Sequence, residues 1–381
     1  MHASAIAPGR GAVRERAWGS ADLLRLLAVP GREQEILASI LRALPSRETA
    51  VLLERIAYHR IDGLAHRAVE LLPPEGIDPW LRSSLKRRHQ RISAATLSQG
   101  LALAEVLDGL ARRRLPVIVM RGLRSVEGIY GDSGSRPFED HDLLVLPGDF
   151  DVARAVLARQ GFEEAAPGLF RRGGVIVDLH ADPLGARRRP TRATIFPLPT
   201  ESLFERAAPG SVAGGPALVP SAEDELLLLA IHLVKHSFDR LIRVADLAHL
   251  LVARARTLDA EILRHRAEAS RTTLLLGWAL QAAAALGAPM ATEPASRPGR
   301  LASILMRRVL DLRPYPYTGE ILMSLAAPTL KDRMHFALDA FLPSDAAPAA
   351  GVWRRAMIAP HRTAALLRQA VWQAAERRRA R

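Results

Sequence analysis

Cysteine is absent from the 381-residue chain. Its absence excludes disulfide bonds, thiolate metal sites and cysteine nucleophiles, and it is typical of proteins in a reducing compartment. Lysine is scarce as well, because only Lys86, Lys235 and Lys331 are present. The formal net charge of +13 therefore comes almost entirely from arginine. Such a charge permits contact with nucleic acid or anionic lipid but does not establish it.

Aromatic side chains and long apolar runs are also few. Aromatic residues make up 5% of the chain and hydrophobic residues 49%, which favours a globular protein whose helices pack through leucine, alanine and valine. The longest weakly polar run, 272–291, is rich in alanine and is interrupted by polar and helix-breaking residues, so we expect a buried helix instead of a membrane span. The first 16 residues lack the apolar core of a signal peptide. We therefore expect a cytoplasmic protein.

The spacing of apolar residues changes along the chain, and proline and glycine mark the breaks. Apolar residues three to four apart predict helices, whereas β-branched runs of five or six residues predict strands. Small, basic, aperiodic stretches predict disorder. The resulting parts are a disordered N-terminus (1–18), an N-terminal helical region (19–113) that ends in a long helix (79–113), an α+β core (114–200), a C-terminal helical domain (221–345) and a basic C-terminal helix or tail (352–381).

The predicted core alternates strands and helices. A β-branched run over 115–120 is followed by a helical stretch, a second strand over 142–146 and another helix. Gly173 and Gly174 then separate two strand-like runs, which indicates a hairpin. This order predicts an α+β fold with a small mixed sheet and helices on one face. The stretch 182–220 is rich in Pro, Gly and Arg and is predicted to be a long irregular connection.

Three aspartates are the strongest candidates for chemistry. Asp140 and Asp142 lie one residue apart at the start of a predicted strand, and alternation of side chains points them the same way. Two such carboxylates are costly unless a cation lies between them, and Mg²⁺ prefers oxygen ligands. Asp178 supplies a third carboxylate near the end of another strand-like run. The pattern alone also fits two solvated acids, but the distant third acid favours a metal site.

Several other polar residues fit structural roles better than chemical ones. His232 and His236 have the i, i+4 spacing that can hold zinc, but no third ligand is evident in the sequence. We expect both to be structural. We expect Asp246 to anchor helices that pack on the core, and His180 to be a partly buried hydrogen-bonding residue.

The middle of the chain resembles the uncharacterised nucleotidyltransferase family of the polymerase-β-like superfamily. The pattern extends over about 50–345, and its motifs are most specific over 115–182. In this sequence the motifs are Val117-Ile-Val-Met-Arg-Gly122, Tyr130, Arg136, Asp140-His-Asp142 with its apolar strand, Gly161-Phe162, and Val177-Asp-Leu-His180. The chain departs from the family at Arg121, where lysine is usual, and at His141, where a branched aliphatic residue is usual. The Gly-Ser pair common in the superfamily is absent after the first strand.

The resemblance implies transfer of a nucleoside monophosphate from an NTP, ATP in the first instance, to a hydroxyl group, with release of pyrophosphate. Asp140 and Asp142 would hold two Mg²⁺ ions, with Mn²⁺ as an alternative, and Asp178 would complete the site of the catalytic ion. The acceptor would be a sugar, peptide or protein hydroxyl, in keeping with enzymes of bacterial biosynthetic clusters.

The same resemblance implies the residues that bind the nucleotide. Gly122 would let the backbone approach the phosphates, and Arg121 or Arg136 would neutralise them. Arg136 has the alternative of a surface pair with Glu139 or Asp140. His141 should point away from the metal ions if the strand alternates.

Two other classes of protein remain open. The departures at Arg121 and His141 suit a catalytically inactive nucleotide-binding or adaptor protein. The segment 352–381 carries eight arginines and one glutamate, which suits binding to nucleic acid or to an anionic membrane. Ordinary packing of a terminal helix explains the same segment equally well.

Overall fold

The computed structural model describes residues 20–31, 33–185, 190–289, 300–312 and 318–341. The predicted disordered N-terminus (1–18) and the basic tail (352–381) lie outside the described residues, so both remain predictions.

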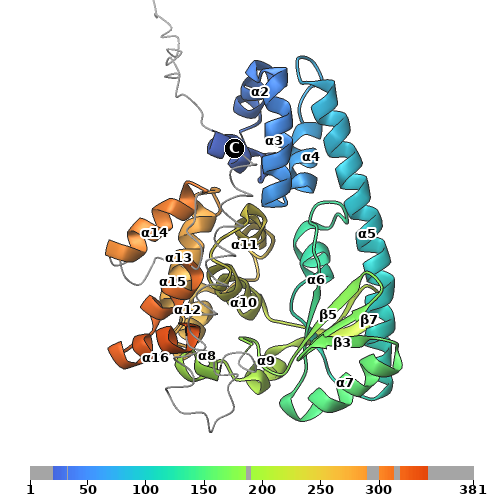
Figure 1. Cartoon of the computed structure of the whole chain (residues 1–381), viewed down its shortest axis with the longest axis vertical. Helices are drawn as coiled ribbons and strands as arrows, with labels where there is room; N and C mark the ends of the chain where they lie inside the picture. Colours follow the sequence, from blue (N-terminus) through green and yellow to red (C-terminus); the bar gives the residue numbers. More distant parts are fainter. Residues whose placement is uncertain (1–19, 32, 186–189, 290–299, 313–317, 342–381) are drawn as a thin grey trace, which may run out of the picture.

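The N-terminal part is helical, and its last helix extends far beyond the others. Asp78 caps that helix, because its carboxylate accepts a hydrogen bond of 2.8 Å from the backbone N–H of Trp80, and Pro79 occupies the first turn. The helix runs from the N-terminal cluster along one side of the sheet (Figure 1). It matches the helix predicted over 79–113. The elements are α1 (Ser20–Leu27), α2 (Gln34–Ala43), α3 (Ser46–His59), α4 (Asp62–Glu70) and α5 (Pro79–Arg112).

Seven strands form one mixed sheet in the order β3-β4-β5-β2-β1-β7-β6. At its centre β2 pairs in parallel with β5 and antiparallel with β1, and β1 pairs in parallel with β7. The hairpin predicted around Gly173 and Gly174 is confirmed as β4 and β5. The strands are β1 (Ile118–Val119), β2 (His141–Leu144), β3 (Glu163–Ala166), β4 (Leu169–Arg172), β5 (Val175–His180), β6 (Ala208–Val212) and β7 (Gly215–Val219).

The prediction of an irregular connection over 182–220 is wrong. This stretch contains the short helices α8 (Pro190–Ile195) and α9 (Thr200–Arg206), followed by the β6–β7 hairpin. Both strands of that hairpin contain Pro or Gly, which lower strand propensity. Their local sequence therefore does not predict strands. The sheet is therefore larger than predicted.

Helices contact both faces of the sheet, not one. On the first face, α5 and α7 (Phe150–Arg159) pack on Val119, Leu143 and Val177. On the second face, a smaller cluster joins Ile118, Met120 and Leu144 of the sheet to Leu203 of α9 and Leu228 of α10 (Ala222–Lys235). Side chains of a strand alternate, so residues two positions from Leu144 also face α10.

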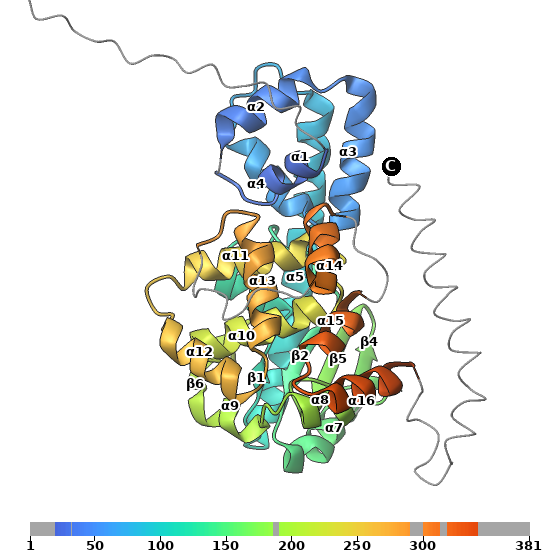
Figure 2. The same ribbon diagram turned by 90° about the vertical axis from the view of Figure 1, so that its left-hand side faces the viewer.

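The C-terminal part is a cluster of helices that lies beside the sheet (Figure 2). Ser221 caps its first helix, because its Oγ accepts a hydrogen bond from the backbone N–H of Asp224. The run 272–291 contains the buried helix α13, as predicted. None of the helices in the described ranges has the length and apolar character needed to cross a bilayer. The remaining helices are α11 (Leu241–Ala253), α12 (Ala260–Ala269), α13 (Thr273–Ala284), α14 (Arg300–Leu310), α15 (Thr318–Ala326) and α16 (Leu330–Phe341).

The predicted α+β class, with a mixed sheet flanked by helical regions, is thus confirmed. Between β1 and β2 the chain forms α6 (Leu123–Ser125) and a π-helical turn, η1 (Val126–Tyr130). A 3-10 turn, η2 (Pro147–Asp149), leads into α7.

Candidate active site

The central strands β2 and β5 hold two aspartates side by side. In their parallel register Asp142 lies opposite Asp178, and Leu144 lies opposite His180. Both aspartates therefore project from the face of the sheet that carries Leu144, which is the face toward α10. Asp142 is 5% exposed and Asp178 is 7% exposed. Two carboxylates so deeply buried need positive charge beside them.

Asp142, Asp178 and His180 form a group that can hold a metal ion. One ligand atom from each residue lies within 4.8 Å of the other two. The Nε2 atom of His180 is 3.0 Å from Oδ1 of Asp142 and 3.4 Å from Oδ2 of Asp178. Carboxylates suit Mg²⁺ and Mn²⁺, and an added imidazole is tolerated better by Mn²⁺ and other transition metals. The residues present therefore fit a divalent ion.

His180 makes the buried hydrogen bond that the sequence predicts, but its position also makes it a possible metal ligand. The signal was present in the sequence, because Asp178 and His180 are two residues apart on one strand and so share a face. The strand register then brings both beside Asp142.

Arg121 binds Asp142 through two hydrogen bonds. Its Nε lies 2.9 Å from Oδ2, and its Nη2 lies 2.7 Å from Oδ1. Burial alone would raise the pKa of Asp142, but the charge of Arg121 and the hydrogen bond from His180 outweigh it and hold that pKa well below its ordinary value. Asp142 is therefore ionised. A metal ion would compete with Arg121 for the same two oxygens.

Asp140 is not one of the three residues whose ligand atoms lie within 4.8 Å of one another. Its charge nevertheless interacts with the charges of Asp142 and Asp178. Its side chain is partly buried. Burial raises the pKa of Asp140, and the neighbouring charges of Asp142 and Asp178 raise it further, whereas Arg121 lowers it. A cation bound among the three aspartates would favour the ionised form of Asp140.

Gly122 allows the chain to pass close to the start of β2. Its φ of +79° suits glycine, and an added Cβ would lie 2.6 Å from the carbonyl oxygen of Asp140. A side chain at this position would push apart the two segments that carry Arg121 and Asp140.

His141 points to the opposite face of the sheet from the aspartates, as strand alternation predicts. It is fully buried, and its ring centroid lies 5.1 Å from that of Phe138. Neither ring nitrogen makes a hydrogen bond of good geometry within the described ranges, although a polar contact with the backbone of Gln99 is close enough to raise the pKa of His141 against the effect of burial. Burial lowers the pKa of His141 to about 4, so the ring is neutral at neutral pH.

Arg136 is bound to the helical region instead of to its sequence neighbours. Its Nε lies 2.8 Å from Oδ1 of Asp246, and its Nη2 lies 2.8 Å from Oδ2. The hydroxyl of Tyr130 donates a further hydrogen bond to Asp246, at 2.8 Å. The alternative of a surface pair between Arg136 and Glu139 or Asp140 is therefore not what the structure shows. The anchoring role predicted for Asp246 is confirmed.

Helix α10 brings three further basic residues toward the site, and their position depends on long-range packing that local sequence patterns do not encode. The pKa of Lys235 is lowered to about 7, mainly by burial and also by the charges of Arg121 and Arg192, while Asp142 and Asp178 oppose the shift. The rings of His232 and His236 lie 4.2 Å apart between centroids, and burial lowers the pKa of both. The described residues offer this pair no third metal ligand. This agrees with the structural role predicted for both.

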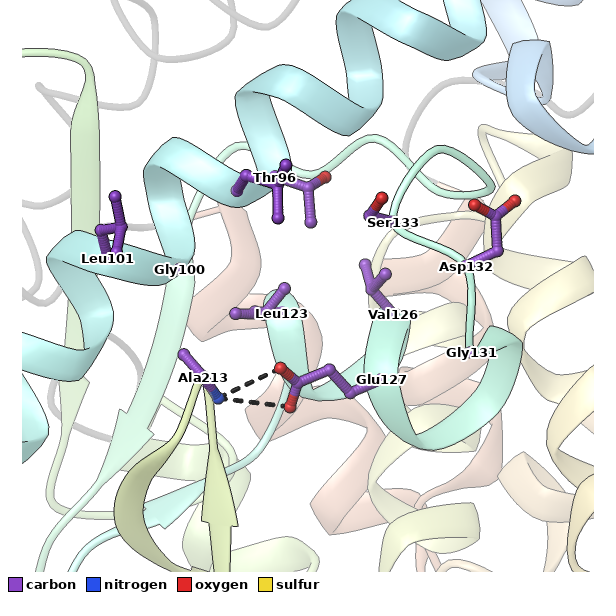
Figure 3. Close-up of a pocket in the computed structure, with 11 residues that line it drawn as sticks. Thr96, Gly100, Leu101, Leu123, Val126, Glu127, Gly131, Asp132, Ser133 and Ala213 are labelled. Atoms are coloured by element: carbon purple, nitrogen blue, oxygen red, sulfur yellow. Dashed lines mark hydrogen bonds between the residues drawn. The ribbon is translucent and has the colours of Figure 1, made fainter.

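A separate cavity of about 530 Å³ lies between α5, the α6–η1 segment and the β6–β7 turn (Figure 3). The carboxylate of Glu127 closes one side of it by accepting hydrogen bonds of 3.1 and 3.3 Å from the backbone N–H of Ala213 (Figure 3). Its lining is apolar and acidic, and it contains neither lysine nor arginine. Such a lining does not suit a triphosphate.

A comparison with known protein families gives a match that spans the site. The family model described as uncharacterised nucleotidyltransferase matches residues 45–287, which is well over half of the chain. The match includes the whole sheet, the three aspartates and α10. No curated protein and no solved structure matches the sequence. The chain belongs to the uncharacterised nucleotidyltransferase family.

Proposed function

We propose that this protein is an Mg²⁺-dependent enzyme that transfers a nucleoside monophosphate from an NTP, preferably ATP, to a hydroxyl group and releases pyrophosphate. The observation that carries the proposal is the pairing of Asp142 with Asp178 across β2 and β5, in a sheet that the family model covers. The need for ATP and the lack of cysteine favour the cytoplasm as its place of action.

The carboxylates would hold the cations of the reaction. Asp142 and Asp178, with His180 beside them, would bind one divalent ion, and Asp140 would join Asp142 in binding a second. Bound Mg²⁺ or Mn²⁺ would neutralise phosphate charge and lower the pKa of the acceptor hydroxyl. Asp178 would accept the proton of that hydroxyl, and burial of the site would limit the water that competes with the acceptor.

Arg121 would change partners during nucleotide binding. It now donates to both oxygens of Asp142, so a cation at Asp142 would compete with these two hydrogen bonds. The released guanidinium would stand beside the bound nucleotide and could pair with a phosphate in a bidentate manner. Arg136, in contrast, would have to abandon a buried pair with Asp246 to do so, and we assign it to the stability of the fold.

The ion pair between Arg121 and Asp142 also favours the second candidate, an inactive nucleotide-binding or adaptor protein. If Arg121 holds Asp142 permanently, the protein would bind nucleotide without turning it over. The third candidate, binding of nucleic acid or membrane through 352–381, predicts that deletion of this segment abolishes binding and its salt dependence.

Label transfer separates these candidates. The protein is incubated with Mg²⁺ and each α-³²P-labelled NTP, with sugars, peptides and the protein itself as acceptors. The proposal predicts label in an acceptor and release of pyrophosphate, both lost in Asp178→Asn. Nucleotide binding without any transfer would favour the inactive protein, and transfer by Asp178→Asn at the wild-type rate would refute the assigned site.

A further inference from the structure

Helix α10 crosses the face of the sheet on which the candidate metal ligands stand. Leu228 of α10 packs with Met120 and Leu144 on that face. Lys235 follows Leu228 by seven residues, which is two helical turns, so the two side chains lie on the same side of the helix. Asp142 precedes Leu144 by two residues on the same strand face. Lys235 therefore lies on the side of α10 that faces the site.

The charges that act on Lys235 agree with this placement. Its ammonium is within electrostatic reach of Asp142 and Asp178, and also of the cations Arg121 and Arg192. His232, one turn before Lys235, is likewise within reach of Arg121. The side chain is only partly exposed.

Of the three cations Arg121, Arg192 and Lys235, only Lys235 lacks a partner among the described residues. Arg121 is bound to Asp142, and Arg192 donates a hydrogen bond of 2.9 Å to Oε1 of Glu320. Within the part of the chain that the structure describes, the amino group of Lys235 has neither a hydrogen-bond acceptor nor an ion-pair partner. A partly buried amine with unused N–H groups is costly, and it gains most from an anionic ligand with several oxygens.

We propose that Lys235 binds the phosphate oxygens of the nucleotide, so that α10 completes the site begun by the sheet. This inference rests on the proposed function. The ammonium is a compact charge on a flexible stem with three donors, so it can follow the phosphates from NTP to pyrophosphate. Arg121 is restricted by its pair with Asp142, and Arg136 by its pair with Asp246. Lys235 is free to contact the ligand from the opposite side.

Calorimetry with Lys235→Met tests the inference, since methionine preserves the length of the side chain and removes the charge. The probes are ATP and inorganic pyrophosphate, each with Mg²⁺, and Lys86→Met on the exposed surface of α5 is the matched control. A lost charge-assisted hydrogen bond predicts roughly a 10- to 100-fold weaker affinity for both probes. Lys235→Arg should recover most of the affinity, and binding of Mn²⁺ alone should be unchanged in all variants.

The outcomes separate the two proposals. Wild type that binds neither probe refutes the proposed function together with this inference. Wild type that binds both probes, with Lys235→Met binding equally well, overturns the role of Lys235 and leaves the proposed function standing.

Amine labelling of the wild-type protein provides a test that needs no variant. The chain has only three lysines, so a brief reaction with an acylating reagent, followed by peptide mass spectrometry, reports on each one. We expect ATP with Mg²⁺ to protect Lys235 at least several-fold and to leave Lys86 and Lys331 unchanged. Equal labelling of Lys235 with and without the nucleotide would overturn the inference.

Discussion

Replacement of His141 by valine should stabilise the protein, although it changes a fully buried residue in the central strand β2. The imidazole has two ring nitrogens without hydrogen-bond partners in the described structure, and each such buried group costs about 1–3 kcal/mol. Valine is β-branched and suits a strand, but it leaves a small void that costs about 1 kcal/mol. The net gain in the free energy of unfolding at pH 7.5 should be about 1–5 kcal/mol.

The gain should grow in acid. The folded pKa of His141 is lowered from 6.5 to about 4, so between these values the unfolded chain binds more protons and the wild type loses stability as the pH falls. By linkage, this loss amounts to about 2 kcal/mol at pH 5 and approaches 3 kcal/mol near pH 4. The nearby charge of Asp142 opposes the shift but does not cancel it. Valine does not titrate, so His141→Val should lack this component.

Urea unfolding followed by tryptophan fluorescence at pH 7.5 and pH 5 measures both effects. The exposed His265 of α12 offers the control, because His265→Gln should change stability by less than about 0.5 kcal/mol at either pH. If His141→Val is less stable than wild type at pH 7.5, or if the difference between the two does not grow at pH 5, the ring is solvated or bonded and the reasoning fails.

Three further predictions concern the buried ion pairs and the turn beside them. Asp142→Asn should lower the free energy of unfolding by about 3–5 kcal/mol, since it leaves Arg121 buried and unpaired, and the double variant Arg121→Met/Asp142→Asn should recover most of that loss in the same urea assay. Asp246→Asn should also cost about 3–5 kcal/mol because it weakens the pair with Arg136, and a thermal melt that does not shift would contradict this. Gly122→Ala should cost at least about 1–2 kcal/mol from its positive φ alone, and an unchanged midpoint of unfolding would show that the two segments can separate without penalty.

Features set by local sequence could be predicted. The long helix α5 follows from its apolar spacing and its Asp-Pro start, and the β4–β5 hairpin follows from Gly173 and Gly174. The opposite directions of His141 and Asp142 on β2 follow from strand alternation. Each of these needs information from only a few neighbouring residues.

Features set by distant contacts could not be predicted. The β6–β7 hairpin is a pair of strands with poor local propensity, and β7 gains its place by pairing with β1, about a hundred residues earlier. Arg136 has acidic neighbours in the sequence, yet it pairs with Asp246, 110 residues away. Lys235 approaches Asp142 only because α10 packs across the sheet. The local spacing of apolar and polar residues carries no information about contacts between residues so far apart in the sequence.

Calorimetry of ATP binding, with and without Mg²⁺, is the most direct test of the proposed metal-dependent nucleotide site. Asp178→Asn removes a carboxylate of the site without leaving Arg121 unpaired, and the exposed Asp151→Asn on α7 is the matched control. We expect wild type and Asp151→Asn to bind ATP only when Mg²⁺ is present. Asp178→Asn should bind ATP at least about 10-fold more weakly, because it loses a charged metal ligand. Equal binding by Asp178→Asn, or binding that does not depend on Mg²⁺, would contradict it.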